Sequence, residues 1–203
     1  MDPMKVGILA YGSLIDDPGE EIFPHIVDRL SVVTPFMVEF ARSSRTRGGA
    51  PTLVPVKVGG DKVKATVLVL EETVTPIQAT NMLYRRETNR VSNFDIIYDP
   101  KSSSKDATKI VSLTGKDAFG LSVVLYTHLN ANIEPLTPDH LAKLAVQSAQ
   151  TEAGKNKRDG ISYLINVIEN ENQTPLTPDY RQAILKKTGS TSLMEAWNKL
   201  TQQ

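Results

Sequence analysis

The first apolar segment of the chain reads Ile8-Leu9-Ala10-Tyr11-Gly12-Ser13-Leu14-Ile15-Asp16-Asp17-Pro18-Gly19, and it breaks at a tyrosine, a glycine and a serine. Its beginning predicts a strand over Lys5 to Ala10. Because glycine adopts backbone conformations that other residues resist, Gly12 allows a tight turn in which successive main-chain N–H groups point at one spot. Such a turn can bind an anion or a developing oxyanion, and a plain strand-to-loop turn is an equally good interpretation.

The composition is typical of a globular protein with one domain of ordinary size. Hydrophobic residues make up 40% and charged residues 23% of the 203 residues, which is enough chain to bury a core. No apolar run approaches the roughly 20 residues that span a bilayer, so no membrane partner is expected. Asp16 and Asp17 interrupt the early apolar segment, so we expect no secretion signal and a cytoplasmic location.

Charge and cysteine content exclude further classes of function. Lysine and arginine together number 23, as do aspartate and glutamate, so no net field favours nucleic acid as a partner. The chain has no cysteine, which excludes thiol nucleophiles, disulfides and thiolate metal sites. The three histidines, His25, His128 and His140, follow no metal-ligand spacing, so we expect packing or surface positions for them.

Alternating and apolar segments predict a strand-rich first part of the chain. Residues 36–41 alternate with period two, which indicates a half-buried strand. A hairpin is expected next, with strands over 52–58 and 63–70 around Gly59-Gly60-Asp61. The short turns between these strands predict an antiparallel sheet or a barrel. Further strands are predicted over residues 93–98, 109–113 and 121–127.

Helix signals mark one early segment and then the second part of the chain. A short helix, disturbed by Pro24, is predicted over residues 20–30. Threonine as N-cap with proline in the first turn predicts three helix starts, at Thr75-Pro76, Thr137-Pro138 and Thr177-Pro178. No linker separates these parts, so the sequence predicts a single α+β domain over residues 1–203.

An acidic residue follows the apolar face of the helix that starts at Pro76. Glu87 lies four residues beyond Leu83 and therefore on the same face. A bare carboxylate in apolar surroundings costs several kcal/mol, so Glu87 must be paired, hydrogen-bonded or catalytic. Taken alone, the position favours an ion pair with Arg85, Arg86 or Arg90, or a partly exposed helix end, over a general base.

Taken together, the two stretches resemble the γ-glutamylcyclotransferase superfamily, and most closely its ChaC-like glutathione-degrading branch. Tyr11-Gly12-Ser13-Leu14-Ile15, followed by Pro18-Gly19, is similar to the opening loop of that branch. Leu83-Tyr84-Arg85-Arg86-Glu87 is similar to its Leu-x-x-Arg-Glu segment, whose glutamate is the catalytic base. The loop over 43–51, with Arg47-Gly48, is similar to the Ser…Arg-Gly loop of the family. The resemblance therefore covers most of the chain in the right order.

The resemblance implies a fold, and the chain departs from the family's usual sequence at two places. The implied fold is α+β: a small mixed or antiparallel β-barrel with surrounding helices and a helical C-terminal tail, in a single domain over 1–203. Glu87 is followed by Thr88-Asn89 where many relatives have a glycine, and Leu9-Ala10 stands where a Trp or Phe is frequent. These departures concern the identity of the substrate more than the fold.

The resemblance also implies a reaction of transferase or lyase type. The α-amine of a γ-glutamyl amide, such as glutathione, a γ-glutamyl peptide or a γ-glutamylamine, attacks its own γ-carbonyl and forms 5-oxoproline. Glu87 is then the catalytic base, and the turn of Tyr11, Gly12, Ser13 and Leu14 binds the substrate and its oxyanion. The reaction requires no enzyme nucleophile, no metal and no organic cofactor, because folding the substrate back makes the attack intramolecular.

Two further expectations complete this hypothesis. Arg47 is a candidate for binding the substrate α-carboxylate, because a guanidinium matches a carboxylate, and a solvated arginine is an equally good interpretation. The expected partner is a small γ-glutamyl molecule, and the sequence makes no prediction of the oligomeric state. The alternative function is a binding protein for a γ-glutamyl-like or carboxylate metabolite without turnover, which need not keep Glu87 beside an intact turn.

Overall fold

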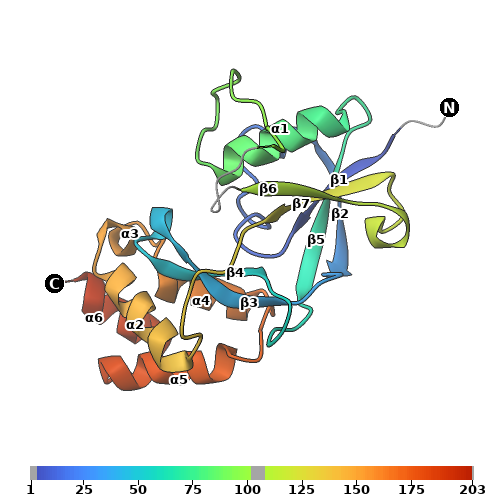
Figure 1. Ribbon diagram of the computed structural model, residues 1–203. Coiled ribbons are helices and arrows are strands. Elements are labelled where there is room, and N and C mark those ends of the chain that lie inside the picture. Colours follow the sequence, from blue (N-terminus) through green and yellow to red (C-terminus); the bar gives the residue numbers. More distant parts are fainter. Residues whose placement is uncertain (1–3, 102–107, 203) are drawn as a thin grey trace. The chain divides into compact units, whose positions relative to one another are not determined.

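The computed structural model describes residues 4–101 and 108–202, and the chain divides into two compact units (Figure 1). Unit 1 consists of Met1–Pro35 and Lys64–Leu129, and unit 2 consists of Phe36–Val63 and Asn130–Gln203. Each unit contains both strands and helices, so the α+β class predicted from the sequence is confirmed. The single domain over 1–203 stays a prediction, and each unit is described by itself.

Unit 1 is built on a mixed five-stranded sheet in the order β2-β5-β1-β7-β6. The central strand β1 pairs antiparallel with β5 and parallel with β7. Its five residues are all buried, as expected of a strand with a neighbour on each side. The strands are β1 (Val6–Ala10), β2 (Ile26–Val33), β5 (Lys64–Leu70), β6 (Lys109–Leu113) and β7 (Val123–His128).

The expected barrel is wrong, because this sheet is open. In the described residues β2 pairs with β5 and β6 pairs with β7, and no ladder joins β2 to β6. The edge strand β2 exposes Asp28 and Arg29, and charged side chains on an edge oppose further strand pairing. The sheet therefore ends at β2 instead of closing.

The helix predicted over residues 20–30 is also wrong. Pro24 lies in a single 3-10 turn, η1 (Phe23–His25), and the chain then enters β2. Half of the residues of β2 are β-branched, and such residues pack well in a strand. Pairing with β5 along the whole of β2 therefore outweighs the helical pattern.

Two further strand predictions differ from the structure. The expected hairpin of 52–58 with 63–70 is not formed, since the first of these strands pairs with β3 and the second with β1 and β2. Residues 93–98 form turns and irregular backbone instead of a strand. Two contacts with residues of α1 (Pro76–Glu87) hold the last of these residues, Tyr98. Its N–H donates to Asn81 Oδ1 at 2.9 Å, and its ring centre lies 5.2 Å from that of Tyr84.

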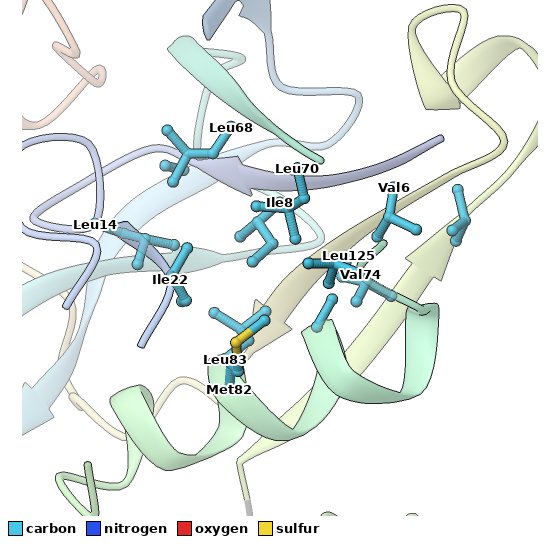
Figure 2. Close-up of a cluster of buried hydrophobic side chains, with 13 residues drawn as sticks. Val6, Ile8, Leu14, Ile22, Leu68, Leu70, Val74, Met82, Leu83 and Leu125 are labelled. Atoms are coloured by element: carbon cyan, nitrogen blue, oxygen red, sulfur yellow. The ribbon is translucent and has the colours of Figure 1, made fainter. Parts of the chain in front are cut away.

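Helix α1 (Pro76–Glu87) covers one face of the sheet of unit 1. It starts as predicted, with Thr75 as N-cap, and Gln78 completes a reciprocal capping box. Its buried Met82 and Leu83 pack into a cluster with residues of the strands, drawn in Figure 2. The other members of this cluster are Val6, Ile8, Ala10, Leu14, Ile22, Leu68, Leu70, Val74, Ala79, Val123 and Leu125. The core of unit 1 thus ties the turn after β1 to the helix that carries Glu87.

Unit 2 packs five helices around a two-stranded sheet. Strands β3 (Val38–Ser44) and β4 (Ala50–Pro55) form a hairpin with the 3-10 turn η2 (Arg45–Arg47) at its tip. Phe40 is fully buried, and its ring makes edge-to-face contacts with two tyrosines at centroid distances of 6.2 and 5.2 Å. The helices are α2 (Pro138–Ala149), α3 (Glu152–Lys155), α4 (Gly160–Glu169), α5 (Thr177–Thr188) and α6 (Leu193–Thr201).

The predicted helix starts of unit 2 are confirmed in one case and corrected in the other. Thr137 caps α2 with its side chain, which accepts from the His140 N–H. At α5 the N-cap is Leu176, because the Thr177 hydroxyl accepts instead from the Thr174 N–H at 2.8 Å. Within residues 4–101 and 108–202, no helix combines the length and the apolar character that crossing a membrane requires.

A buried carboxylate, Glu39, makes unit 2 sensitive to pH. The side chain is fully buried and accepts hydrogen bonds from the Thr174 hydroxyl and from the N–H groups of Phe40 and Leu176. Burial raises the pKa of Glu39 above its ordinary value of 4.5, and these hydrogen bonds offset only part of that rise. Folding therefore takes up a proton between the ordinary and the folded-state pKa, so the stability of unit 2 falls as pH rises through this window.

We accordingly expect the free energy of unfolding of unit 2 to increase as pH is lowered from neutral towards about 4.5. Urea unfolding followed by the fluorescence of Trp197, the one tryptophan of the chain, measures this at several pH values. The Glu39→Gln variant should lose this part of the pH dependence. An unchanged slope in that variant would assign the effect to other groups.

Candidate active site

The turn that follows β1 is fixed at both its backbone and its side chains. The N–H groups of Ile15 and Asp17 donate to the carbonyls of Gly12 and Ser13 at 3.0 and 2.9 Å. The Tyr11 hydroxyl donates to the carbonyl of Thr127 in β7 at 2.9 Å. The turn is therefore held against the parallel strand pair of β1 and β7.

Three consecutive main-chain N–H groups of this turn are available. Among the residues that the structure describes, the N–H groups of Gly12, Ser13 and Leu14 have no acceptor. Fixed N–H donors without an acceptor are suited to stabilising negative charge that develops on a substrate oxygen. The oxyanion-binding role of the turn stays a prediction, beside the alternative of a simple turn.

Glu87 is the last residue of α1, and its side chain is 16% exposed. Its Oε1 accepts from Arg86 Nη1 at 2.6 Å, so the ion pair foreseen as the alternative to catalysis is present. In the described part of the chain, no residue hydrogen-bonds the second oxygen, Oε2. One face of the carboxylate is thus paired, and the other can accept a proton from a bound group.

Arg86 connects Glu87 to the turn. Its Nη2 donates to the Asp17 carbonyl at 2.7 Å and lies 3.4 Å from Ser13 Oγ. The backbone of Gly19 passes close by, with a φ of +85°, and a Cβ there would lie 3.1 Å from Arg86 Cγ. Glycine at this position therefore allows both the left-handed backbone and the approach of the arginine. The carboxylate and the turn consequently share one hydrogen-bonded network.

Only part of this network is predictable from the sequence. Arg86 was a predicted ion-pair partner of Glu87, whereas its contacts with the turn were not predicted. The signal was the Pro18-Gly19 pair after the turn, which brings the chain back towards α1. Arg47 belongs to unit 2, where its guanidinium carbon lies 5.0 Å from the centre of the Tyr163 ring. The structure thus unites the turn with Glu87, while the role of Arg47 stays a prediction.

A cavity of about 750 Å³ lies beside α1 in unit 1, and none of the predicted site residues lines it. At its wall Arg85 pairs with Glu21, and both side chains are more than 90% buried, with exposed fractions of 8% and 9%. Burial alone would raise the pKa of Glu21, but hydrogen bonds from Arg85 and the Ser92 N–H lower it below its usual value. The cavity is also lined by Glu20, Pro24, His25, Thr73, Val74, Gln78, Asn81, Met82 and Phe94.

The contacts of Arg86 predict a local effect on the turn. Arg86→Gln removes the donors to Asp17 and Glu87, and we expect the amide protons of Ile15 and Asp17 to exchange about tenfold faster, the effect of about one strong hydrogen bond. Hydrogen exchange of intact protein measures this. Arg90→Gln is the matched control, because Arg90 is exposed. Equal exchange in the two variants would show that Arg86 does not hold the turn.

Comparisons of the chain with protein-family models, with curated proteins and with solved structures find no match. A function is therefore inferred from the turn, from Glu87 and from the contacts that Arg86 makes with both.

Proposed function

We propose that the protein is a γ-glutamylcyclotransferase-type enzyme that converts a γ-glutamyl amide into 5-oxoproline and releases the amine. The observation that carries this proposal is the network through which Arg86 contacts the carboxylate of Glu87 and the turn that begins at Tyr11. The same two segments carry the resemblance to the superfamily. As part of the proposal, we assign the chain to the γ-glutamylcyclotransferase-like fold, with an open sheet.

In the proposed reaction Glu87 acts first as base and then as acid. The substrate α-ammonium loses a proton to Glu87 Oε2, and the free amine attacks the γ-carbonyl carbon. A C–N bond forms, and the N–H groups of Gly12, Ser13 and Leu14 bind the oxyanion. The attacking nitrogen then releases its second proton to solvent, and when the bond to the leaving amine breaks, Glu87 returns the first proton to the leaving nitrogen. The enzyme ends in its starting state, and the products are 5-oxoproline and the amine.

Arg86 has a positioning role in this proposal. Its contact with Oε1 fixes the orientation of the Glu87 carboxylate and leaves Oε2 for the substrate ammonium. The substrate ammonium would approach a carboxylate that is oriented before binding, which reduces the entropy lost in reaching the reactive geometry.

The same ion pair favours a second candidate function. The ion pair with Arg86 accounts for the Glu87 carboxylate without a role as base, and it therefore suits a protein that binds a γ-glutamyl-like or carboxylate metabolite without turnover. In this case the N–H groups of the turn bind an anionic group of the ligand in its ground state. The two candidates therefore differ in whether product forms.

Formation of 5-oxoproline distinguishes the enzyme from the binding protein. The full-length protein is incubated with glutathione, γ-glutamyl dipeptides and γ-glutamylamines, and 5-oxoproline is measured beside the Glu87→Gln variant. Release of 5-oxoproline that depends on Glu87 supports the enzyme. Ligand binding detected by calorimetry without release supports the binding protein, and neither binding nor release overturns both.

A further inference from the structure

The cavity beside α1 takes no part in the reaction described above. Its volume of about 750 Å³ is within the range of roughly 300–1,000 Å³ that is typical of sites for small molecules. Four of its lining residues come from α1, at positions 78, 81, 82 and 85, which lie on one face of the helix. Arg86 and Glu87 do not line it, so the cavity is a second candidate site in unit 1.

The positive groups in the wall of this cavity already have negative partners. Arg85 donates to Glu21 through Nε and Nη2, and its Nη1 donates to the Ile96 carbonyl. His25 Nδ1 lies 2.7 Å from Glu71 Oε1, so the imidazole also has a carboxylate beside it. Among the described lining residues, an anion would therefore find no cation that lacks a counter-charge.

Glu20 leaves the wall of the cavity with an excess of negative charge. The residue is exposed, and in the part of the chain that the structure describes no hydrogen bond or ion pair engages its carboxylate. Phe94 adds an aromatic ring that is 71% exposed, and the guanidinium carbon of Arg85 lies 5.5 Å from the ring centre. Aromatic rings attract cations, so both residues favour a positively charged ligand.

The apolar part of the wall indicates a hydrocarbon body for this ligand. Val74 and Met82 line the cavity and also belong to the core cluster drawn in Figure 2, so the core holds them in place. Apolar side chains stabilise a bound hydrocarbon chain but not a metal ion. Within residues 4–101 and 108–202 there is also no group of three acidic or histidine side chains that could hold a metal. These observations favour an organic cation.

We propose that this cavity binds an organic amine, whose ammonium pairs with Glu20 and whose hydrocarbon body packs against Val74 and Met82. The inference does not rest on the proposed function, because no residue of the proposed reaction lines the cavity. That reaction assigns an ammonium to Glu87, so the experiment has to distinguish the two carboxylates.

Calorimetry of the full-length protein with hexylamine, hexanol and hexanoate at neutral pH tests the proposal. The three probes share a hydrocarbon body and differ in charge. We expect hexylamine to bind with a Kd in the millimolar range, as befits so small a ligand. It should bind about fivefold more tightly than hexanol, the upper value for an exposed ion pair, and hexanoate should bind no more tightly than hexanol.

Three variants locate the site. Glu20→Gln should abolish the preference for hexylamine over hexanol. Glu72→Gln is the matched control, because it makes the same change at an exposed residue of unit 1 that does not line the cavity, and it should keep the preference. Glu87→Gln should keep it as well. In wild type, hexylamine should shift the NMR signals of the side-chain amides of Gln78 and Asn81, which line the cavity.

Several results would overturn the proposal. Hexanoate that binds as tightly as hexylamine would contradict the inferred charge of the ligand, and absence of hexylamine binding would contradict the site itself. Equal loss of the preference in Glu20→Gln and Glu72→Gln would assign it to the general charge of the surface. A preference that is lost in Glu87→Gln and kept in Glu20→Gln would place the ammonium at the site of the proposed reaction instead.

Discussion

Glu87→Gln is expected to lower the kcat for 5-oxoproline release by at least about 100-fold, the lower end of what a general base contributes. The amide keeps the size of the side chain and a hydrogen-bond acceptor, but it cannot take a proton from the substrate ammonium. Because the last residue of α1 is replaced by a residue of similar helix propensity, the helix should remain. Steady-state kinetics with the best γ-glutamyl substrate measures the effect.

The control for this experiment is Glu72→Gln, which makes the same chemical change at an exposed position of unit 1. It should leave kcat and KM at wild-type values. Turnover that survives Glu87→Gln would remove Glu87 from the role of base. A loss of turnover together with loss of the folded state, seen by circular dichroism, would show that the ion pair with Arg86 is structural.

Arg85→Met is expected to destabilise unit 1 by about 3–5 kcal/mol, the range found when one partner of a buried ion pair is removed. Arg85 Nε donates to both oxygens of Glu21, and its Nη1 donates to the Ile96 carbonyl at 3.1 Å. Without the guanidinium, the Glu21 carboxylate stays buried with only the Ser92 N–H as a described donor. Hydrogen exchange of peptides from unit 1 reports this loss.

Two variants complete the experiment on the buried pair. The double variant Glu21→Leu with Arg85→Met should recover most of the stability, since a buried ion pair can often be exchanged for apolar groups. Lys155→Met breaks an ion pair with Glu152 in which both side chains are more than 60% exposed, and it should cost less than about 1 kcal/mol. Equal costs in Arg85→Met and Lys155→Met would contradict the importance of burial.

The Glu21 carboxyl also gives unit 1 a pH dependence opposite to that of unit 2. Its folded-state pKa is lowered, so its stabilising contribution is present above the ordinary value of 4.5 and is lost as pH falls below it. The raised pKa of Glu39 has the reverse effect on unit 2. Acid should therefore weaken unit 1 below about pH 4.5, where the stabilisation of unit 2 by protonated Glu39 is already fully present.

Local chemistry made several elements predictable from the sequence. Thr75 and Thr137 cap their helices as expected, because a threonine hydroxyl satisfies an N–H group of the first turn in any tertiary context. The strand before Tyr11 was predictable for a similar reason, since its apolar run fits a position with sheet neighbours on both sides. Such elements depend little on distant parts of the chain.

The elements that were predicted wrongly from the sequence depend on strand partners that are distant in the chain. Residues 26–33 form an edge strand because β5, more than 30 residues later, pairs with them. The segment over 52–58 satisfies its strand pairing with β3, so the glycines at 59 and 60 do not close a hairpin. Alternation of apolar residues predicts a strand but does not identify its neighbour.

The candidate site also combines features that the local sequence specifies with features that depend on distant parts of the chain. The turn and Glu87 could be named from two short motifs, and the apolar face of α1 placed the carboxylate at the edge of the core. The contact of Arg86 with Asp17 joins residues 69 positions apart, and no local pattern specifies it.

The division of the chain into units has a consequence for how the molecule can be taken apart. The backbone leaves unit 1 after Pro35, returns to it at Lys64 and leaves it again after Leu129, so the two units are interleaved along the polypeptide. Ending translation at Leu129 would leave β3 and β4 without any of the five helices that pack in their unit and would strip the cover from Phe40. Neither half of this molecule can therefore be excised as one continuous piece, and each must wait for the other's residues to emerge from the ribosome before its own sheet or helices are complete.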